Sequence, residues 1–446
     1  NIREMFPEME IRQCGEAQDS MELLELPGIS LDYLLKGLAG ESYRDDAVFQ
    51  ELYSWYLQSP EYRTLVKRLT EVSFSERPSD MIGKTVAGIL YGEVSPYSAT
   101  RLERFAACAF AHFLQYGLKV TERAEYEFRA MDMGNVMHMA LEKFAAEVRK
   151  EGLDWADLTE EERNRIIDDC LDQVSADYGN TVLKSSARNE YMIERTRRIL
   201  RRTVWALQEQ LKHGEFRPEG FEVKFEGGRI DRVDIMEEPE KNRVYVKVID
   251  YKTGNTSFDM LALYHGLQLQ LMIYLDGALK VEQRKYPDRE IVPAGIFYYN
   301  VKDPMIQEKI HADVERVQDQ VMKKLKMNGL VQADDDVSIK IDETLASIPV
   351  SRNKDGSFSR RSSVASRQQF NALGEYVRRK ICDIRESILD GNAAVAPYEL
   401  GKKNACTYCP YITVCGFDRK IPGYEFHRLP SFSESDLWKK IMKEDE

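Results

Sequence analysis

Two neighbouring stretches with the alternation of β-strands constrain the fold of this chain more than any other feature. Residues 221–235 read FEVKFEGGRIDRVDI and residues 244–254 read VYVKVIDYKTG, with a short polar turn between them. Because successive strand residues face opposite sides of a sheet, Asp250 and Lys252 share one face of the second strand. Taken alone, such an Asp-x-Lys pair is most often part of an edge strand with solvated charges. The rest of the sequence changes that interpretation.

Composition limits the class of protein. The 446 residues are 43% hydrophobic and 31% charged, which is typical of a globular protein with room for two or three domains. The sequence contains neither an apolar run of membrane-spanning length nor a signal-peptide pattern at its start, so we expect a soluble, cytoplasmic protein. The net charge of −12 argues against nonspecific coating of nucleic acid but allows a local basic groove. Because the first residue is Asn1, we expect a fragment of a longer chain.

Helical patterns surround the two predicted strands. The first segment, residues 1–91, is mostly helical in pattern, and its Gly83-Lys84-Thr85 resembles the end of a phosphate-binding loop. Pro78 stands where that loop needs its first glycine, which excludes ATP binding there. Apolar periodicity predicts further helices over residues 96–116, 131–150, 189–212, 265–279, 303–345 and 367–391, and a strand over residues 291–300. The pattern indicates an α/β fold with a central mixed sheet and flanking helices, preceded by a helical segment.

Three of these helices carry polar residues beside their apolar stripes. In the first, Thr100 can cap the helix with Glu103 as its return partner. In the second, His138 borders the core stripe, where a boundary histidine is commoner than a metal ligand. In the fourth, Gln270 and Tyr274 lie one turn apart on one face.

A run of arginines marks the helix predicted over residues 189–212. Runs of this kind usually form solvated faces, but this density also suits contact with phosphates. The run consists of Arg195, Arg197, Arg198, Arg201 and Arg202, and Arg360 and Arg361 form a second, shorter basic stretch.

The residues near the ends of the two strands suit hydrolysis of a phosphodiester. Asp231 and Asp250 offer the hard oxygen ligands that Mg²⁺ and Mn²⁺ prefer. A bound metal ion lowers the pKa of a water molecule and neutralises charge developing on a phosphate oxygen. Lys252 can orient that water or stabilise the transition state, and His138 can complete the metal site. Gln270 can hold a water molecule or a phosphate.

The cysteines form a second, independent pattern. Seven cysteines in a chain of this length do not indicate a disulfide framework. Cys406, Cys409 and Cys415 make a C-x2-C-x5-C cluster that needs a fourth soft ligand, for which Cys108 is the natural candidate. Four thiolates suit either zinc or a [4Fe–4S] cluster, and the residues alone do not separate these. Such a site would join the beginning of the domain to its end, so we interpret it as structural.

In chain order, the helical histidine, Gly-x-x-Asp, Asp-x-Lys and Gln-x-x-x-Tyr motifs resemble the RecB-type branch of the PD-(D/E)xK nuclease superfamily. The matching segments are GNVMHMALE, GGRIDRVD, VIDYKTG and QLMIY. The resemblance implies a nuclease site made of His138, Asp231, Asp250, Lys252, Gln270 and Tyr274, with His138, Asp231 and Asp250 holding Mg²⁺. The family spacing favours Asp231 as the ligand and leaves Asp234, on the opposite strand face, as a structural or secondary residue.

One cysteine before these motifs and three after them are arranged as in iron–sulfur nucleases. Together with the segments SATRLERFAACAFAHFLQYGL and ACTYCPYITVCGFD, this arrangement is similar to the C-terminal part of the B subunits in the AddAB family of bacterial helicase–nucleases. The resemblance covers about residues 92–429, leaving residues 1–91 as a helicase-side remnant and residues 430–446 as a tail. It implies a [4Fe–4S] cluster on the four cysteines. Ala109 departs from the family, which usually has proline there.

The resemblance also implies a function. It predicts a Mg²⁺-dependent DNA exonuclease, paired with an AddA-type helicase–nuclease subunit, that processes double-strand ends and cuts the 5′-ended strand, with single-stranded DNA at the nuclease site. One rival is a stand-alone iron–sulfur exonuclease of the CRISPR-associated type, which is shorter and would not explain residues 1–91. The other is a catalytically idle DNA-binding or scaffold module.

Overall fold

The chain forms two compact units, Asn1–Ser79 and Asp80–Glu446. The computed structural model describes residues 27–38, 47–73, 80–92, 98–121, 130–178, 186–306, 313–421 and 423–442. Within these residues, no helix combines the length and the apolar character that crossing a membrane requires.

The described part of the first unit is helical, in agreement with the sequence pattern. The apolar faces of its helices enclose a small core that includes Leu34, Tyr56 and Val66. The hydroxyl groups of Ser30 and Tyr56 are hydrogen-bonded at 2.8 Å inside this unit. Its helices are α2 (Pro27–Leu38), α3 (Ala47–Gln58) and α4 (Arg63–Ser73).

The second unit is built on a six-stranded mixed sheet with the strand order β1-β2-β3-β4-β5-β6. The first three strands are antiparallel neighbours, β3 and β4 are parallel, β5 is antiparallel to β4, and β6 is parallel to β5. The strands are β1 (Arg217–Phe225), β2 (Gly228–Glu238), β3 (Arg243–Lys252), β4 (Glu290–Asn300), β5 (Asn328–Gln332) and β6 (Val364–Ala365). The predicted α/β fold with a central mixed sheet is confirmed.

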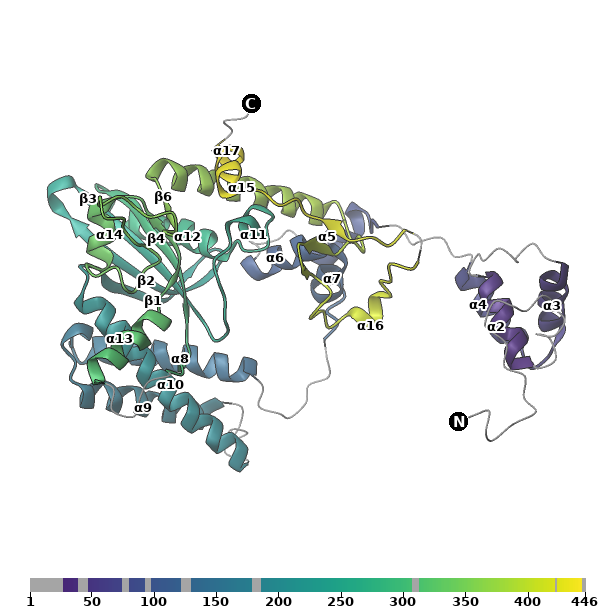
Figure 1. The fold of residues 1–446 in the computed structure, drawn as a ribbon, viewed down its shortest axis with the longest axis horizontal. Coiled ribbons are helices and arrows are strands. Elements are labelled where there is room, and N and C mark those ends of the chain that lie inside the picture. The colour runs from purple at the N-terminus through teal and green to yellow at the C-terminus, as the bar shows by residue number, and fades with distance from the viewer. Residues whose placement is uncertain are drawn as a thin grey trace. The chain divides into compact units, whose positions relative to one another are not determined.

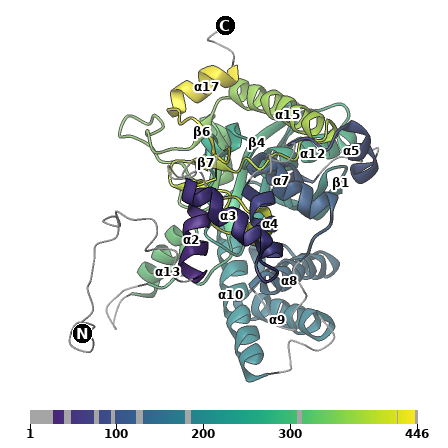
Figure 2. The same ribbon diagram turned by 90° about the vertical axis from the view of Figure 1, so that its right-hand side faces the viewer.

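Helices cover both faces of this sheet, as Figures 1 and 2 show. One face packs against α8 (Ala130–Lys150), α9 (Glu160–Asp177) and α10 (Ala187–Lys212) in a large apolar core. The other face packs against a second set of helices, which contribute a separate core. This set comprises α5 (Lys84–Tyr91), α6 (Ala99–Ala107), α12 (Gln270–Lys285), α15 (Arg367–Leu389) and α17 (Glu434–Met442).

The remaining elements are short. They connect the layers or form a small three-stranded sheet near the cysteine-rich end, with the strand order β8-β7-β9. They are α7 (Ala109–His112), α11 (Met260–Tyr264), α13 (Val314–Lys324), α14 (Asp335–Ile341), α16 (Ile412–Cys415), β7 (Tyr398–Leu400), β8 (Lys403–Asn404) and β9 (His427–Arg428).

The structure differs from the sequence predictions at several boundaries. The division after Ser79 lies before α5, which packs with the second unit through Ala87 and Tyr91, so the expected boundary at residue 91 falls one helix later. The expected C-terminal tail likewise contains α17, whose Trp438 joins the same core. The predicted helix over residues 303–345 was wrong in its middle, where β5 pairs with β4; five residues are too few for periodicity to reveal.

A cluster of three buried charges lies within the sheet layer that faces α8 to α10. Asp234, which is fully buried, accepts hydrogen bonds from Arg232 at 2.6 and 2.9 Å and pairs with Lys247 of β3 at 3.0 Å. The Arg232 guanidinium also lies over the rings of Trp155 and Phe221. Burial acts to raise the pKa of Asp234, but the two cations outweigh it and hold that pKa below its ordinary value.

Removal of the Asp234 carboxylate should therefore destabilise the fold strongly. In Asp234→Ala, Arg232 and Lys247 stay buried without their counter-charge, which costs about 3–5 kcal/mol of unfolding free energy. Chemical denaturation of the purified protein measures this loss. Asp169→Ala, which breaks only the exposed pair of Asp169 with Arg165, is the matched control and should change stability far less. Equal effects of the two substitutions would contradict the role assigned to the buried cluster.

Candidate active site

The two predicted carboxylates meet where β2 begins and β3 ends. The backbone N–H of Tyr251 donates to Asp231 Oδ2 at 2.8 Å, which holds Asp231 against β3 beside Asp250. Burial and the neighbouring charge of Asp250 raise the pKa of Asp231 well above its ordinary value. Burial also raises the pKa of Asp250, against the opposing effect of Lys252. Two buried carboxylates that disfavour each other's charge make a site that a cation would stabilise.

Lys252 is held in place by a chain of three polar side chains. Its Nζ lies 2.6 Å from Asp250 Oδ2 and donates to Gln270 Oε1 at 2.8 Å. Gln270 in turn donates through Nε2 to the hydroxyl of Tyr274 at 2.9 Å. The structure thus brings together the Asp-x-Lys and Gln-x-x-x-Tyr motifs, with Gln270 and Tyr274 in support of the lysine.

His138 reaches the same site from α8. Its Nδ1 lies 3.4 Å from Asp231 Oδ2, and its ring packs edge-on against Tyr251. Burial lowers the pKa of His138, and the charge of Lys252 lowers it further, so the imidazole is neutral and able to ligate a metal ion at neutral pH. Gly134, one turn earlier, faces Thr253 so closely that a Cβ there would lie 3.3 Å from the threonine hydroxyl.

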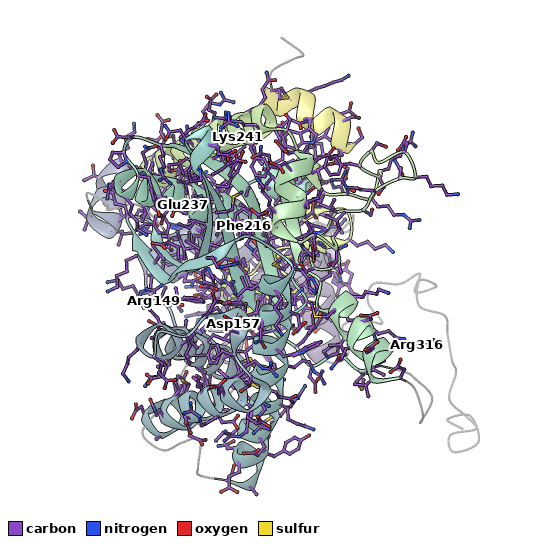
Figure 3. The ribbon with its side chains drawn as sticks, turned by 90° about the vertical axis from the view of Figure 1, so that its left-hand side faces the viewer. Arg149, Asp157, Phe216, Glu237, Lys241 and Arg316 are labelled. Atoms are coloured by element: carbon purple, nitrogen blue, oxygen red, sulfur yellow. The ribbon has the colours of Figure 1, made fainter. Side chains whose placement is uncertain are left out.

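A further contact fixes α8 against β1. Arg149, near the end of α8, donates to the backbone carbonyl of Glu219 in β1 at 2.7 Å, and Figure 3 shows Arg149 at this position. The close approach at Gly134 and the Arg149 contact together determine where α8 presents His138.

Glu222 is a site residue that the sequence reasoning missed. One ligand atom each from His138, Glu222 and Asp231 lie within 4.8 Å of one another. Glu222 adopts a left-handed backbone conformation within β1, with φ of 47°, which departs from the alternation of the strand. Two of the three expected metal ligands therefore share a cluster with Glu222, whereas Asp250, the third, is paired with Lys252. An acid in an alternating strand gives no sequence signal of such a turn.

Glu103 differs from its prediction. Instead of returning to Thr100 in its own helix, its Oε1 accepts hydrogen bonds from the backbone N–H groups of Leu269 and Gln270, at 2.7 and 3.0 Å. Burial raises the pKa of Glu103 to about 7, and the two backbone N–H groups oppose this rise. The residue thus lies at the start of α12, directly behind the side chain that holds Lys252.

The four predicted cysteine ligands line one small cavity. Cys108 lies between α6 and α7, Cys406 and Cys409 lie in the loop after β8, and Cys415 ends α16. Burial and the neighbouring thiols raise the pKa of Cys406 to about 11. The N–H of Phe417 points to the Cys415 sulfur at 3.4 Å, a contact suited to a thiolate. The donor set therefore fits a metal or cluster that neutralises four thiolates.

The arginine run on α10 is partly used for packing. Arg197 pairs with Asp172 at 2.6 Å, and Arg201 pairs with Asp168, both across the contact with α9. Arg202 lies over the ring of Trp205. Arg195 and Arg198 are exposed.

A basic groove of about 560 Å³ lies between α12, α15 and the β1–β2 turn. Its floor is apolar, and one wall is Phe225, whose ring packs edge-on against Tyr274 of the active site. The acids in its lining are Glu226 and Asp276. The cations in its lining are Lys224, Lys280, Arg284, Arg378 and Arg385. In a chain with a net charge of −12, this excess of cations is local and lies next to the site.

Comparison with known proteins agrees with this geometry. Residues 96–416 match the family model of the PD-(D/E)XK nuclease superfamily. The chain is 37% identical to the B subunit of an ATP-dependent helicase/deoxyribonuclease from Lachnoclostridium phytofermentans, over 100% of the chain and 40% of that protein. It is 33% identical to the protein of the same name from Alkaliphilus metalliredigens, over 100% of the chain and 41% of that protein. The chain therefore spans about two fifths of the length of these relatives.

The cluster of His138, Glu222 and Asp231 predicts a measurable role for Glu222 in metal binding. Glu222→Gln removes one negative charge with little change in shape, so the affinity for Mn²⁺ should fall by about tenfold or more. Isothermal titration with Mn²⁺ measures the change. Glu226→Gln, which neutralises an acid four residues later, is the control and should bind as the unaltered protein does. Unchanged affinity in Glu222→Gln would remove Glu222 from the site.

Proposed function

Because the chain belongs to the PD-(D/E)XK nuclease superfamily, we propose that it is the nuclease part of a helicase/deoxyribonuclease B-type chain and hydrolyses DNA phosphodiester bonds with Mg²⁺ or Mn²⁺. The observation that carries the proposal is the convergence of one histidine, three acids and one lysine at the ends of β2 and β3. An idle scaffold module would have no need of a lysine fixed by polar side chains beside buried acids.

The residues divide the work of hydrolysis. His138, Glu222, Asp231 and Asp250 would hold the metal ion. When bound, the ion supplies Lewis-acid stabilisation of the phosphate and an acidified water molecule. Lys252, kept in place by Asp250 and Gln270, offers a fixed ammonium group that can orient the attacking water and stabilise negative charge on the phosphate. Neutral His138 can ligate without competing with the metal for charge.

The spacing of the cysteine sulfur atoms favours [4Fe–4S] over zinc. Four sulfur atoms bound at about 2.3 Å around a zinc ion lie only about 3.8 Å from one another. Among the described residues, the one group with three or more ligand atoms all within 4.8 Å of one another is that of His138, Glu222 and Asp231. The sulfur atoms of Cys108, Cys406, Cys409 and Cys415 are therefore spread more widely than zinc requires, as a larger cluster would need.

The substrate that suits the basic groove is a single DNA strand. Cations along the rim can contact successive phosphates, and the apolar floor with Phe225 can receive unstacked bases. The Phe225–Tyr274 contact places this groove next to the lysine that acts in hydrolysis. The strand would thus pass from the groove to the scissile position.

The biological setting follows from the relatives. Their shared name describes one component of an ATP-dependent helicase/deoxyribonuclease, which supports an AddA-type motor partner and the processing of double-strand ends, with cutting of the 5′-ended strand. Lys84 of the Gly-Lys-Thr sequence pairs with Asp390 at 3.0 Å rather than lining a phosphate loop, which supports a motor on another chain. A stand-alone exonuclease is disfavoured because these relatives align over the first unit as well.

A nuclease assay with Asp250→Ala tests the proposed function. The purified chain, alone and together with its motor partner, should degrade single-stranded DNA in the presence of Mg²⁺. Asp250→Ala removes both a metal ligand and the partner of Lys252, so kcat should fall by at least about 100-fold. Asp319→Ala, an exposed acid on α13, should keep full activity. If the unaltered protein cuts DNA under none of these conditions, the proposal is wrong.

The cluster assignment has its own test. Protein purified without oxygen should be brown and contain iron and acid-labile sulfide in equal amounts. Cys409→Ser should lose most of the iron and the visible absorbance because one of four ligands is gone. Cys382→Ser changes an exposed cysteine on α15 and should retain both. A colourless protein with one zinc ion per chain would overturn the assignment.

A further inference from the structure

Helix α12 begins with its backbone N–H groups capped by a residue from a distant part of the chain. The first N–H groups of a helix have no partner within the helix, so a side chain or water must accept their hydrogen bonds. Leu269, at the N-cap of α12, has no side chain that can do so. Glu103 of α6 fills this role through the N–H groups of Leu269 and Gln270. A carboxylate at this position also interacts favourably with the helix dipole.

The capped residue is the one that holds the lysine of the site. Gln270 is the first residue of α12, and its side chain accepts from Lys252 Nζ at 2.8 Å. A shift of the start of α12 would therefore move the acceptor of Lys252 and change the position of the ammonium group beside Asp250.

The position of Glu103 depends on the cysteine region. Helix α6 ends at Cys108, the first of the four cysteines. Two contacts fasten α6 to the segment that follows it: Arg101 Nε lies 3.1 Å from His112 Nε2, and Arg104 donates to Gln115 at 2.9 Å. The cap of α12 and a ligand of the cysteine site thus belong to one rigid block.

We propose that Glu103 is a positioning residue of the nuclease site, which caps α12 so that Gln270 holds Lys252 in register. The four-cysteine site fixes the lysine through the same block, although Cys108 takes no part in hydrolysis. This inference rests on the proposed nuclease function and adds to it a residue that touches neither metal nor substrate.

The test compares Glu103→Ala with Glu103→Gln in the complex with the motor partner. Glu103→Ala should lower kcat for single-stranded DNA by about tenfold to 100-fold, because the lysine loses its fixed position. KM for DNA, Mn²⁺ affinity and iron content should stay within about twofold of the unaltered protein. Glu103→Gln should recover most of kcat, because its amide oxygen can accept the same two N–H groups.

A control separates positioning from general loss of a helix cap. Thr159→Ala removes the capping box of α9, which supports no residue of the site, and should lower thermal stability by a similar amount while leaving kcat unchanged. If Glu103→Ala fails to fold, Glu103→Asp shortens the side chain by one methylene and should still lower kcat.

The outcomes distinguish the two levels of the hypothesis. If the unaltered complex does not cut DNA, the proposed nuclease function fails. If it cuts DNA and the folded Glu103 variants have its kcat, or if Thr159→Ala lowers kcat as much, only the positioning role of Glu103 is overturned.

Discussion

The hydrogen bond from the Tyr251 N–H to Asp231 is the contact on which the rest of the site depends. It joins the start of β2 to the end of β3, and so brings two acids from separate strands to one place. Buried acids this close repel each other and need a cation, a lysine or both nearby. Lys252 answers part of that need, and the histidine from α8 and Glu222 from β1 complete a set of ligands for a cation.

Much of the fold and the centre of the site could be predicted from the sequence, because both depend on local pattern. Alternation revealed β2 and β3, and Asp231, Asp250, Lys252, His138 and the pair Gln270 and Tyr274 came from motifs in chain order. Residues that depend on tertiary structure escaped. Glu222 requires a left-handed backbone turn that no pattern announces, and Glu103 caps a helix more than 160 residues away, where its own helix offered a plausible local partner.

The cysteine region illustrates how a structural site can influence a distant reaction. Its four ligands come from both ends of the second unit, so they set the position of α6 relative to the layers around it. Because α6 meets α12 at the residue that supports Lys252, the order of the cysteine site and the order of the active site are connected through one short helix.

The buried cluster of Arg232, Asp234 and Lys247 has a consequence for strand register. The acids and lysine of the site lie on one face of β2 and β3, and the buried cluster lies on the other. A slip of one residue between these strands would exchange the two sets, placing the charges of the site inside the apolar core and the cluster in the cleft. Both sets would then lose their partners at once. The sheet therefore carries a charge pattern on each face that rejects the wrong alignment during folding.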